Sequence, residues 1–146
     1  MAIIIFQSYV FVTSGIITIT DGTKGSSGFR NQIVAEKLDS VMSPDNTVLM
    51  SVAVFNPVAF KSHIQLRQVI HEGVSKKWEK ALKDPQDYVD VILIGGAANS
   101  GDPVRRSLFT NRQRQLELHF KKVYADDEAI IYKRKVESNA ISKSLK

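Results

Sequence analysis

The chain has 146 residues, of which 43% are hydrophobic and 24% charged, so it is predicted to be one globular domain and not a disordered protein. It contains no cysteine, which excludes a disulfide framework, a thiolate metal site and a cysteine nucleophile. The net charge is +5, and all of the excess positive charge lies from Gly101 onward, where there are 11 Lys and Arg residues and 6 Asp and Glu residues. Two interpretations remain open: a surface for anionic partners such as nucleic acid or phospholipid headgroups, or solvated helix faces and a tail.

The first nineteen residues after Met1, Ala2 to Thr20, carry no charge. Their β-branched residues favour two strands broken near Ser14-Gly15. The alternative is the outer end of a transmembrane helix, although a full span needs about 20 apolar residues. A signal peptide is disfavoured, because there is no basic n-region and no small-residue cleavage site. We therefore divide the chain into an apolar segment (1–14, membrane-helix stub or first strand), a single α/β domain (15–135) and a disordered tail (136–146).

The first half of the domain predicts alternating helices and strands. Ser43-Pro44 ends the first helix, because proline disfavours helical geometry in the residue before it. The expected elements in order are a helix at Phe29–Met42, a buried strand at Thr47–Phe55, a turn at Asn56-Pro57, a strand at Leu66–His71 and an amphipathic helix at Val74–Lys83 with Val74, Trp78 and Leu82 on its apolar stripe.

The second half is organised around a strand, a glycine turn and a capped helix. Tyr88–Ile94 is short and apolar, which is typical of a strand buried on both faces. Gly95-Gly96 ends it, and Asp102-Pro103 predicts an N-cap and first helical residue. The helix is expected to reach about Leu118 with Val104, Leu108, Leu116 and Phe120 towards the core, and a hairpin of Lys122–Tyr124 and Ala129–Lys133 closes the domain. This order predicts a three-layer α/β sandwich with a Rossmann-like, mostly parallel sheet and an antiparallel C-terminal edge hairpin.

The known catalytic and cofactor motifs are missing. Gly96 to Gly101 has the glycine spacing of a phosphate-binding loop, but Asp102 and Pro103 stand where that loop needs Lys and Ser or Thr. His71-Glu72 lacks the second histidine of a zincin helix, and neither a dinucleotide fingerprint nor a G-x-S-x-G elbow occurs. We therefore expect no cofactor and no metal.

Candidate binding residues follow from position. Ligands of open α/β sheets collect at the carboxyl ends of the strands. The polar residues expected there are Asn56, His71, Glu72, Asn99 and Asp102, with turn and cap roles as the alternative for each. Three cations of the basic third, Arg105, Arg106 and Arg112, are a second candidate, as a patch for an anionic surface.

Five segments together carry a resemblance: VLMSVAVFNPVAF, LRQVIHEG, KKWEKALKDPQDYVDVILI, GDPV and FKKVYADDEAIIYKR. Over about Gly15 to Arg134 the chain resembles the C-terminal soluble extracytoplasmic domain of bacterial polytopic glycosyltransferase-like membrane proteins, the GT-C class that uses lipid-linked sugars. None of the segments is a catalytic motif, and the catalytic acids of that class belong to its membrane-embedded half. The resemblance makes Ala2–Val12 the stub of the last transmembrane helix.

Two functional hypotheses follow. The first is a non-catalytic accessory domain at the cell membrane, on its extracytoplasmic side, that binds acceptor or carrier. Its expected partners are the membrane-embedded half of the same protein and anionic lipid or a carbohydrate acceptor, with no nucleic acid. The alternative is a free-standing soluble α/β enzyme or nucleotide-like ligand-binding domain.

Overall fold

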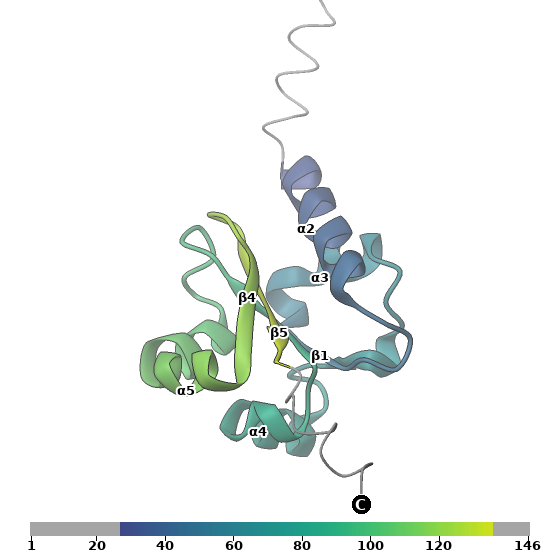
Figure 1. Cartoon of the computed structure of the whole chain (residues 1–146). Coiled ribbons are helices and arrows are strands. Elements are labelled where there is room, and N and C mark those ends of the chain that lie inside the picture. The colour runs from purple at the N-terminus through teal and green to yellow at the C-terminus, as the bar shows by residue number, and fades with distance from the viewer. Residues whose placement is uncertain (1–26, 136–146) are drawn as a thin grey trace, which may run out of the picture.

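The computed structural model describes residues 27–135, so the predictions for Ala2–Thr20 and for the tail lie outside the described part of the chain. Within it, helices alternate with the strands of one mixed sheet (Figure 1). The main elements are α2 (Ser27–Val41), β1 (Val48–Leu49), α3 (Val52–Lys61), β2 (Val69–Ile70), α4 (Ser75–Lys83), β3 (Val91–Gly95), the π-helical turn η3 (Arg105–Thr110), α5 (Asn111–His119), β4 (Phe120–Ala125) and β5 (Ala129–Arg134). Two short 3-10 turns, η1 (Leu66–Gln68) and η2 (Pro85–Asp87), precede β2 and β3.

The five strands lie in the order β2-β1-β3-β5-β4. The first three are parallel, with Val48 beside both Val69 and Val91. β5 runs antiparallel to β3 and to β4, and a bulge between Lys122 and Tyr124 interrupts the last pairing. The predicted α/β class, with a parallel core and an antiparallel C-terminal edge hairpin, is confirmed.

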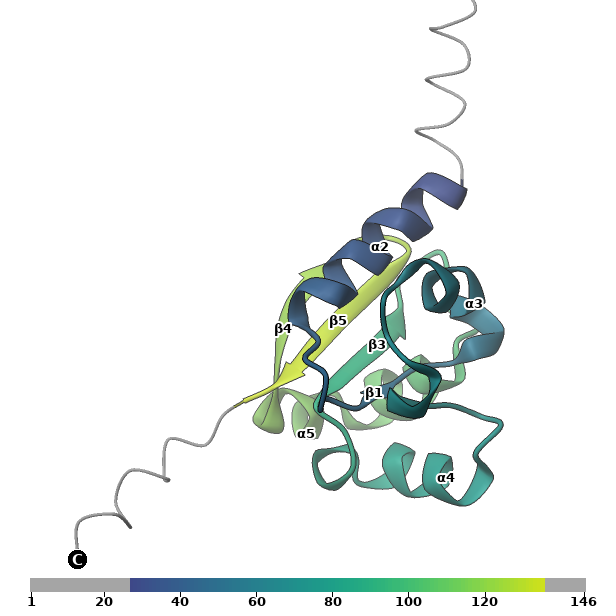
Figure 2. The same ribbon diagram turned by 90° about the vertical axis from the view of Figure 1, so that its right-hand side faces the viewer.

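Strands β1, β2, β3 and β5 are buried on both faces, because their alternate residues join two separate cores, whereas the edge strand β4 is mostly exposed. In β3, Ile92 and Ile94 belong to the core that includes Trp78, Ala81, Val104, Leu108 and Leu116. Val91 and Leu93 belong to the opposite core, with Val34, Leu38, Phe55 and Val58. Helices α2 and α3 thus cover one face, and α4 and the helix after β3 cover the other (Figure 2).

The predicted strand Thr47–Phe55 is wrong over most of its length. Only Val48–Leu49 is strand, and the chain turns at Ser51 into α3. The predicted turn at Asn56-Pro57 lies inside this helix, where the non-helical backbone of Phe55 (φ −112°, ψ 26°) marks a kink just before the proline. Phe55 and Val58, three residues apart, carry the buried face of α3. Packing against the sheet therefore overrides the β-branched composition of the segment.

Several smaller boundaries also differ. Leu66–Gln68 is a 3-10 turn, so the strand predicted at Leu66–His71 shrinks to Val69–Ile70, and the one predicted at Tyr88–Ile94 begins at Val91. In α4, Trp78 is buried and Leu82 packs against the core, but Val74 is 43% exposed, contrary to prediction. The predicted core positions Val104, Leu108, Leu116 and Phe120 are all buried. In residues 27–135, no helix has the length and apolarity needed to cross a membrane.

Candidate functional site

The carboxyl ends of β1, β2 and β3 form the edge where an open α/β sheet places its ligands. From β1 the chain passes through α3 to β2 on one side, and from β2 it returns through α4 to β3 on the other side of β1. The gap between β1 and β3 is therefore the topological switch point of the sheet. Ser51, Glu72 and Asp102 follow β1, β2 and β3 and supply its acidic and hydroxyl groups.

Glu72 caps helix α3 from across the sheet edge. Its carboxylate accepts hydrogen bonds from the Ala53 amide (2.6 Å), the Val52 amide (3.1 Å) and the Ser51 hydroxyl (3.2 Å). Desolvation raises the pKa of Glu72, but the hydrogen bonds from backbone amides and Ser51 outweigh it, so the pKa lies below its ordinary value. The anionic carboxylate thus occupies the N-terminus of α3, where the helix dipole favours negative charge.

Asp102 caps the helix after β3 in the same way, but from a fully buried position. Its carboxylate accepts hydrogen bonds from the amides of Val104 (3.1 Å) and Arg105 (3.2 Å), which confirms the predicted N-cap. It also accepts the Gly95 amide at 2.7 Å, which joins the helix to the end of β3. Burial raises the pKa of Asp102, the three amides oppose that rise, and the charge of nearby Glu72 adds to it.

Gly95 and Gly96 allow the loops at this edge to approach closely. A Cβ on Gly95 would lie 2.3 Å from the Asn99 carbonyl oxygen, and one on Gly96 would lie 2.4 Å from the Asp127 carbonyl oxygen. The Gly96 amide donates to the Glu128 carbonyl at 2.9 Å. Gly96 is therefore required because the β4–β5 turn packs directly on the end of β3, and Gly95 because the loop that follows β3 folds back over it.

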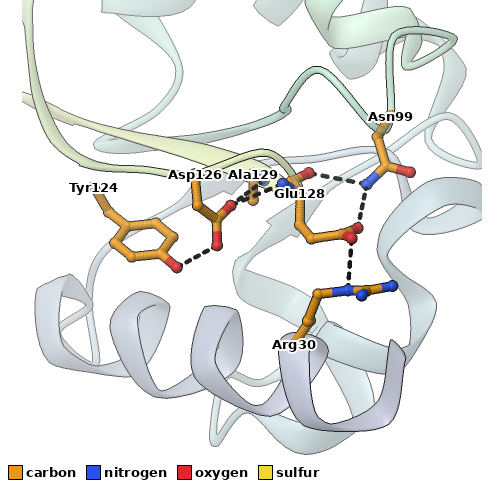
Figure 3. A network of polar contacts seen from close by, with 6 residues as sticks. All are labelled: Arg30, Asn99, Tyr124, Asp126, Glu128 and Ala129. Atoms are coloured by element: carbon orange, nitrogen blue, oxygen red, sulfur yellow. Dashed lines mark hydrogen bonds and ion pairs between the residues drawn. The ribbon is translucent and has the colours of Figure 1, made fainter. Parts of the chain in front are cut away.

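Asn99 belongs to a polar network that fixes three segments to one another (Figure 3). Its side-chain amide donates to the Glu128 carbonyl oxygen at 2.9 Å and approaches the Glu128 carboxylate at 3.3 Å. The other oxygen of that carboxylate pairs with Arg30 of α2 at 2.7 Å. Asp126 holds the turn by accepting the amides of Glu128 and Ala129 and the Tyr124 hydroxyl. Every group in this network already has a partner within the domain.

The remaining two predicted residues do not converge on the switch point. His71 lies at the end of β2, where its Nδ1 accepts the Gly73 amide at 3.1 Å and closes the local turn. Asn56 is exposed on α3, because β1 ends well before the position predicted from sequence. Of the five predicted binding residues, the structure brings Glu72 and Asp102 together at the switch point and places Asn99 in the adjoining network.

The three predicted patch arginines have different surroundings. The Arg105 guanidinium donates to the Gly95 carbonyl oxygen at 2.6 Å and stacks over the Phe109 ring, 4.8 Å from its centroid. Arg112 donates to the Lys83 carbonyl oxygen and is half-buried, while Arg106 is exposed. Arg105 and Arg112 thus donate hydrogen bonds within the domain, and the prediction of an anionic-surface patch stays a prediction.

Sequence reasoning missed Ser51, Arg30 and Glu128 as parts of this edge. Ser51 lies within a segment whose composition predicts a strand, although serine before a helix is a common capping residue. Arg30 and Glu128 lie 98 positions apart in the sequence, and only their packing shows that they pair. No local signal could have found that ion pair.

Chemically, the edge is saturated with internal hydrogen bonds. Both helix N-termini at the switch point already hold a carboxylate of the chain itself, so the amides that would bind a phosphate are occupied. Within residues 27–135, no group of three or more His, Asp or Glu side chains is arranged to hold a metal ion. Comparisons of the chain with family models, with curated proteins and with solved structures found no match.

Proposed function

We propose that the chain is a non-catalytic extracytoplasmic accessory domain of a membrane glycosyltransferase-like protein. In this proposal it binds the acceptor or the lipid-linked carrier beside the membrane-embedded half of the same protein. The partners are that half and a carbohydrate acceptor or anionic lipid, and the location is the outer side of the cell membrane. The resemblance over about Gly15 to Arg134 supports the membrane context.

The main support for a non-catalytic role is that Glu72 and Asp102 act as helix caps. A general acid or base must have a lone pair or proton free for the substrate. Each of these carboxylates accepts three hydrogen bonds from within the domain, which occupy about three of its four lone-pair positions and hold it against a helix N-terminus. The same arrangement disfavours the alternative of a nucleotide-binding domain, because a phosphate would meet two carboxylates and occupied amides.

The finer architecture in this proposal is a three-layer, Rossmann-like sandwich. Its support is the distribution of the two cores, one beneath α2 and α3 and one beneath α4 and the helix after β3. In such a sandwich the residues at either edge of the sheet are held by the ends of helices and strands, which suits a domain that positions an acceptor or carrier.

The membrane context is tested on the native protein. An antibody raised against the purified 146-residue chain is used to probe fractionated host cells. We expect a product well above 16.3 kDa that stays in membranes after alkaline carbonate extraction and that protease digests from the extracytoplasmic side. A native product of about 16 kDa in the soluble fraction would overturn the proposal.

The non-catalytic part is tested on the purified chain. We expect no transfer from lipid-linked sugars and no hydrolysis of nucleoside triphosphates above the buffer rate. Turnover that disappears in Glu72→Gln or Asp102→Asn would contradict it, provided that circular dichroism shows both variants folded.

A further inference from the structure

The segment Phe60–Arg67 runs from the last two residues of α3 into η1, and it is here called the α3–β2 loop. It lies at the edge of the sheet opposite the candidate site. Helix α3 starts at the carboxyl end of β1, and the chain then enters the parallel strand β2 at its amino end. Phe60 is 88% exposed and Leu66 is 70% exposed, the two highest values for large hydrophobic residues in the described part of the chain. Two such side chains within seven residues of one another make this segment a candidate contact surface.

The loop is held in place by hydrogen bonds of residues between Phe60 and Leu66 and just after Leu66. Asp39, near the end of α2, accepts the His63 amide at 2.9 Å and lies 2.8 Å from the His63 ring Nδ1. The Gln68 side-chain amide donates to three carbonyl oxygens, those of Ser43, Pro44 and Asn46, at 3.0–3.1 Å. Its side-chain oxygen accepts the Gln65 amide. The loop is therefore a fixed part of the domain, and Phe60 and Leu66 are presented to solvent by a rigid base.

The charge of the loop is entirely positive. Lys61 follows Phe60 and Arg67 follows Leu66, so each exposed apolar side chain has a cation beside it in the sequence. From Asn46 to His71 there is no Asp or Glu. Asp39 contacts the loop through His63, and Asp45 lies exposed in the turn that the Gln68 side chain holds. Within residues 27–135, neither Lys61 nor Arg67 forms an ion pair.

We propose that the α3–β2 loop binds the surface of an anionic lipid bilayer. Phe60 and Leu66 enter the boundary between headgroups and acyl chains, and Lys61 and Arg67 remain at the level of the lipid phosphates. Two apolar side chains with neighbouring cations suit this occupant. A stable protein interface would need a larger surface, about 800 Å² on each partner. The inference rests on the proposed function in one respect, that the domain lies beside a membrane.

The loop is a better lipid site than the arginines of the C-terminal third. Arg105 and Arg112 already donate to the carbonyl oxygens of Gly95 and Lys83. They would have to break these bonds to reach a headgroup. Lys61 and Arg67 are exposed and lie next to side chains that can enter the lipid.

The test uses the whole chain, whose lack of cysteine allows a single reporter site. Phe60→Cys is labelled with an environment-sensitive fluorophore and mixed with vesicles of 30% phosphatidylglycerol in phosphatidylcholine or of phosphatidylcholine alone. Leu118→Cys is the matched control, because Leu118 is 66% exposed but lies on α5. We expect a blue shift at position 60 on anionic vesicles at low salt, a loss of most of it at 0.5 M salt, and no shift at position 118.

Vesicle sedimentation gives a second measurement that does not depend on a label. The wild-type chain and all variants share residues 1–26, so any contribution of that segment cancels in the comparison. Phe60→Ser combined with Leu66→Ser should lower the partition coefficient on anionic vesicles about tenfold, whereas Leu118→Ser should leave it unchanged. Lys61→Glu combined with Arg67→Glu should remove most of its salt dependence.

The inference is overturned if position 60 shows no shift, or the same shift on neutral vesicles and at high salt. It is also overturned if the chain self-associates through this loop, seen as a salt-independent dimer that Phe60→Ser abolishes, because the loop would then be a protein interface. Either result leaves the fractionation of the native protein unaffected, so failure of the lipid site and failure of the proposed function are distinguishable.

Discussion

We expect that replacing the buried Asp102 by alanine destabilises the domain more than replacing any exposed aspartate or glutamate does. Asp102 is fully buried and accepts the amides of Gly95, Val104 and Arg105. The loss of an N-cap costs about 0.5–2 kcal/mol. A buried amide left without an acceptor, here that of Gly95, costs about 1–3 kcal/mol more. Relief of the desolvated charge offsets part of this, so we expect a loss of about 2–4 kcal/mol, a large share of a typical 5–15 kcal/mol.

The measurement is urea unfolding, followed by far-ultraviolet circular dichroism and by the fluorescence of Trp78, the single tryptophan. With an m-value of about 2 kcal/mol/M, the midpoint should fall by about 1–2 M. The matched control is Asp45→Ala, an exposed aspartate after α2, which should change stability by less than about 0.5 kcal/mol. If Asp102→Ala costs no more than this control, the cap is not a structural element and the argument that Asp102 is unavailable for chemistry fails.

The pH dependence of the same carboxyl gives an independent check. Burial raises the pKa of Asp102 above the usual 3.8, so between that value and the folded-state pKa the folded protein binds more protons than the unfolded chain. The contribution of this group to stability therefore falls as pH rises through that window. Asp102→Asn should remove the contribution of this group to the pH dependence of the unfolding free energy. A pH profile identical to that of the wild type would contradict the raised pKa of Asp102.

Two further predictions concern Glu72 and the core beneath α4. The pKa of Glu72 is lowered, so its contribution to stability is present above the ordinary value of 4.5 and is lost as pH falls through the folded-state pKa. Glu72→Gln should therefore weaken the loss of stability at acidic pH. An unchanged loss would contradict the capping role. Trp78 is 8% exposed in the core beneath α4, so Trp78→Ala should cost about 3–5 kcal/mol by thermal or denaturant unfolding followed by circular dichroism. A loss under about 1 kcal/mol would mean that this face of α4 is not packed against the sheet.

Much of the fold could be predicted because its signals are local. Asp102-Pro103 specifies a helix start through its own side chain and ring geometry, and Gly95-Gly96 ends β3 where the backbone must approach another loop. The apolar run of β3 indicated burial on both faces, and both cores confirm it. Hydrophobic spacing also indicated the closing hairpin and the buried residues of the helix before it.

The tertiary structure alone decided the segment after β1 and the state of the candidate site. Val52–Phe55 has the composition of a strand but begins helix α3, because the Glu72 carboxylate, about twenty residues away, satisfies the first amides and the sheet buries one face of the helix. Sequence indicated that Glu72 and Asp102 lie at strand ends, yet it could not say whether their oxygen atoms are free. That depends on which amides fold back onto them, and a hydrogen bond between residues distant in the sequence leaves no local pattern.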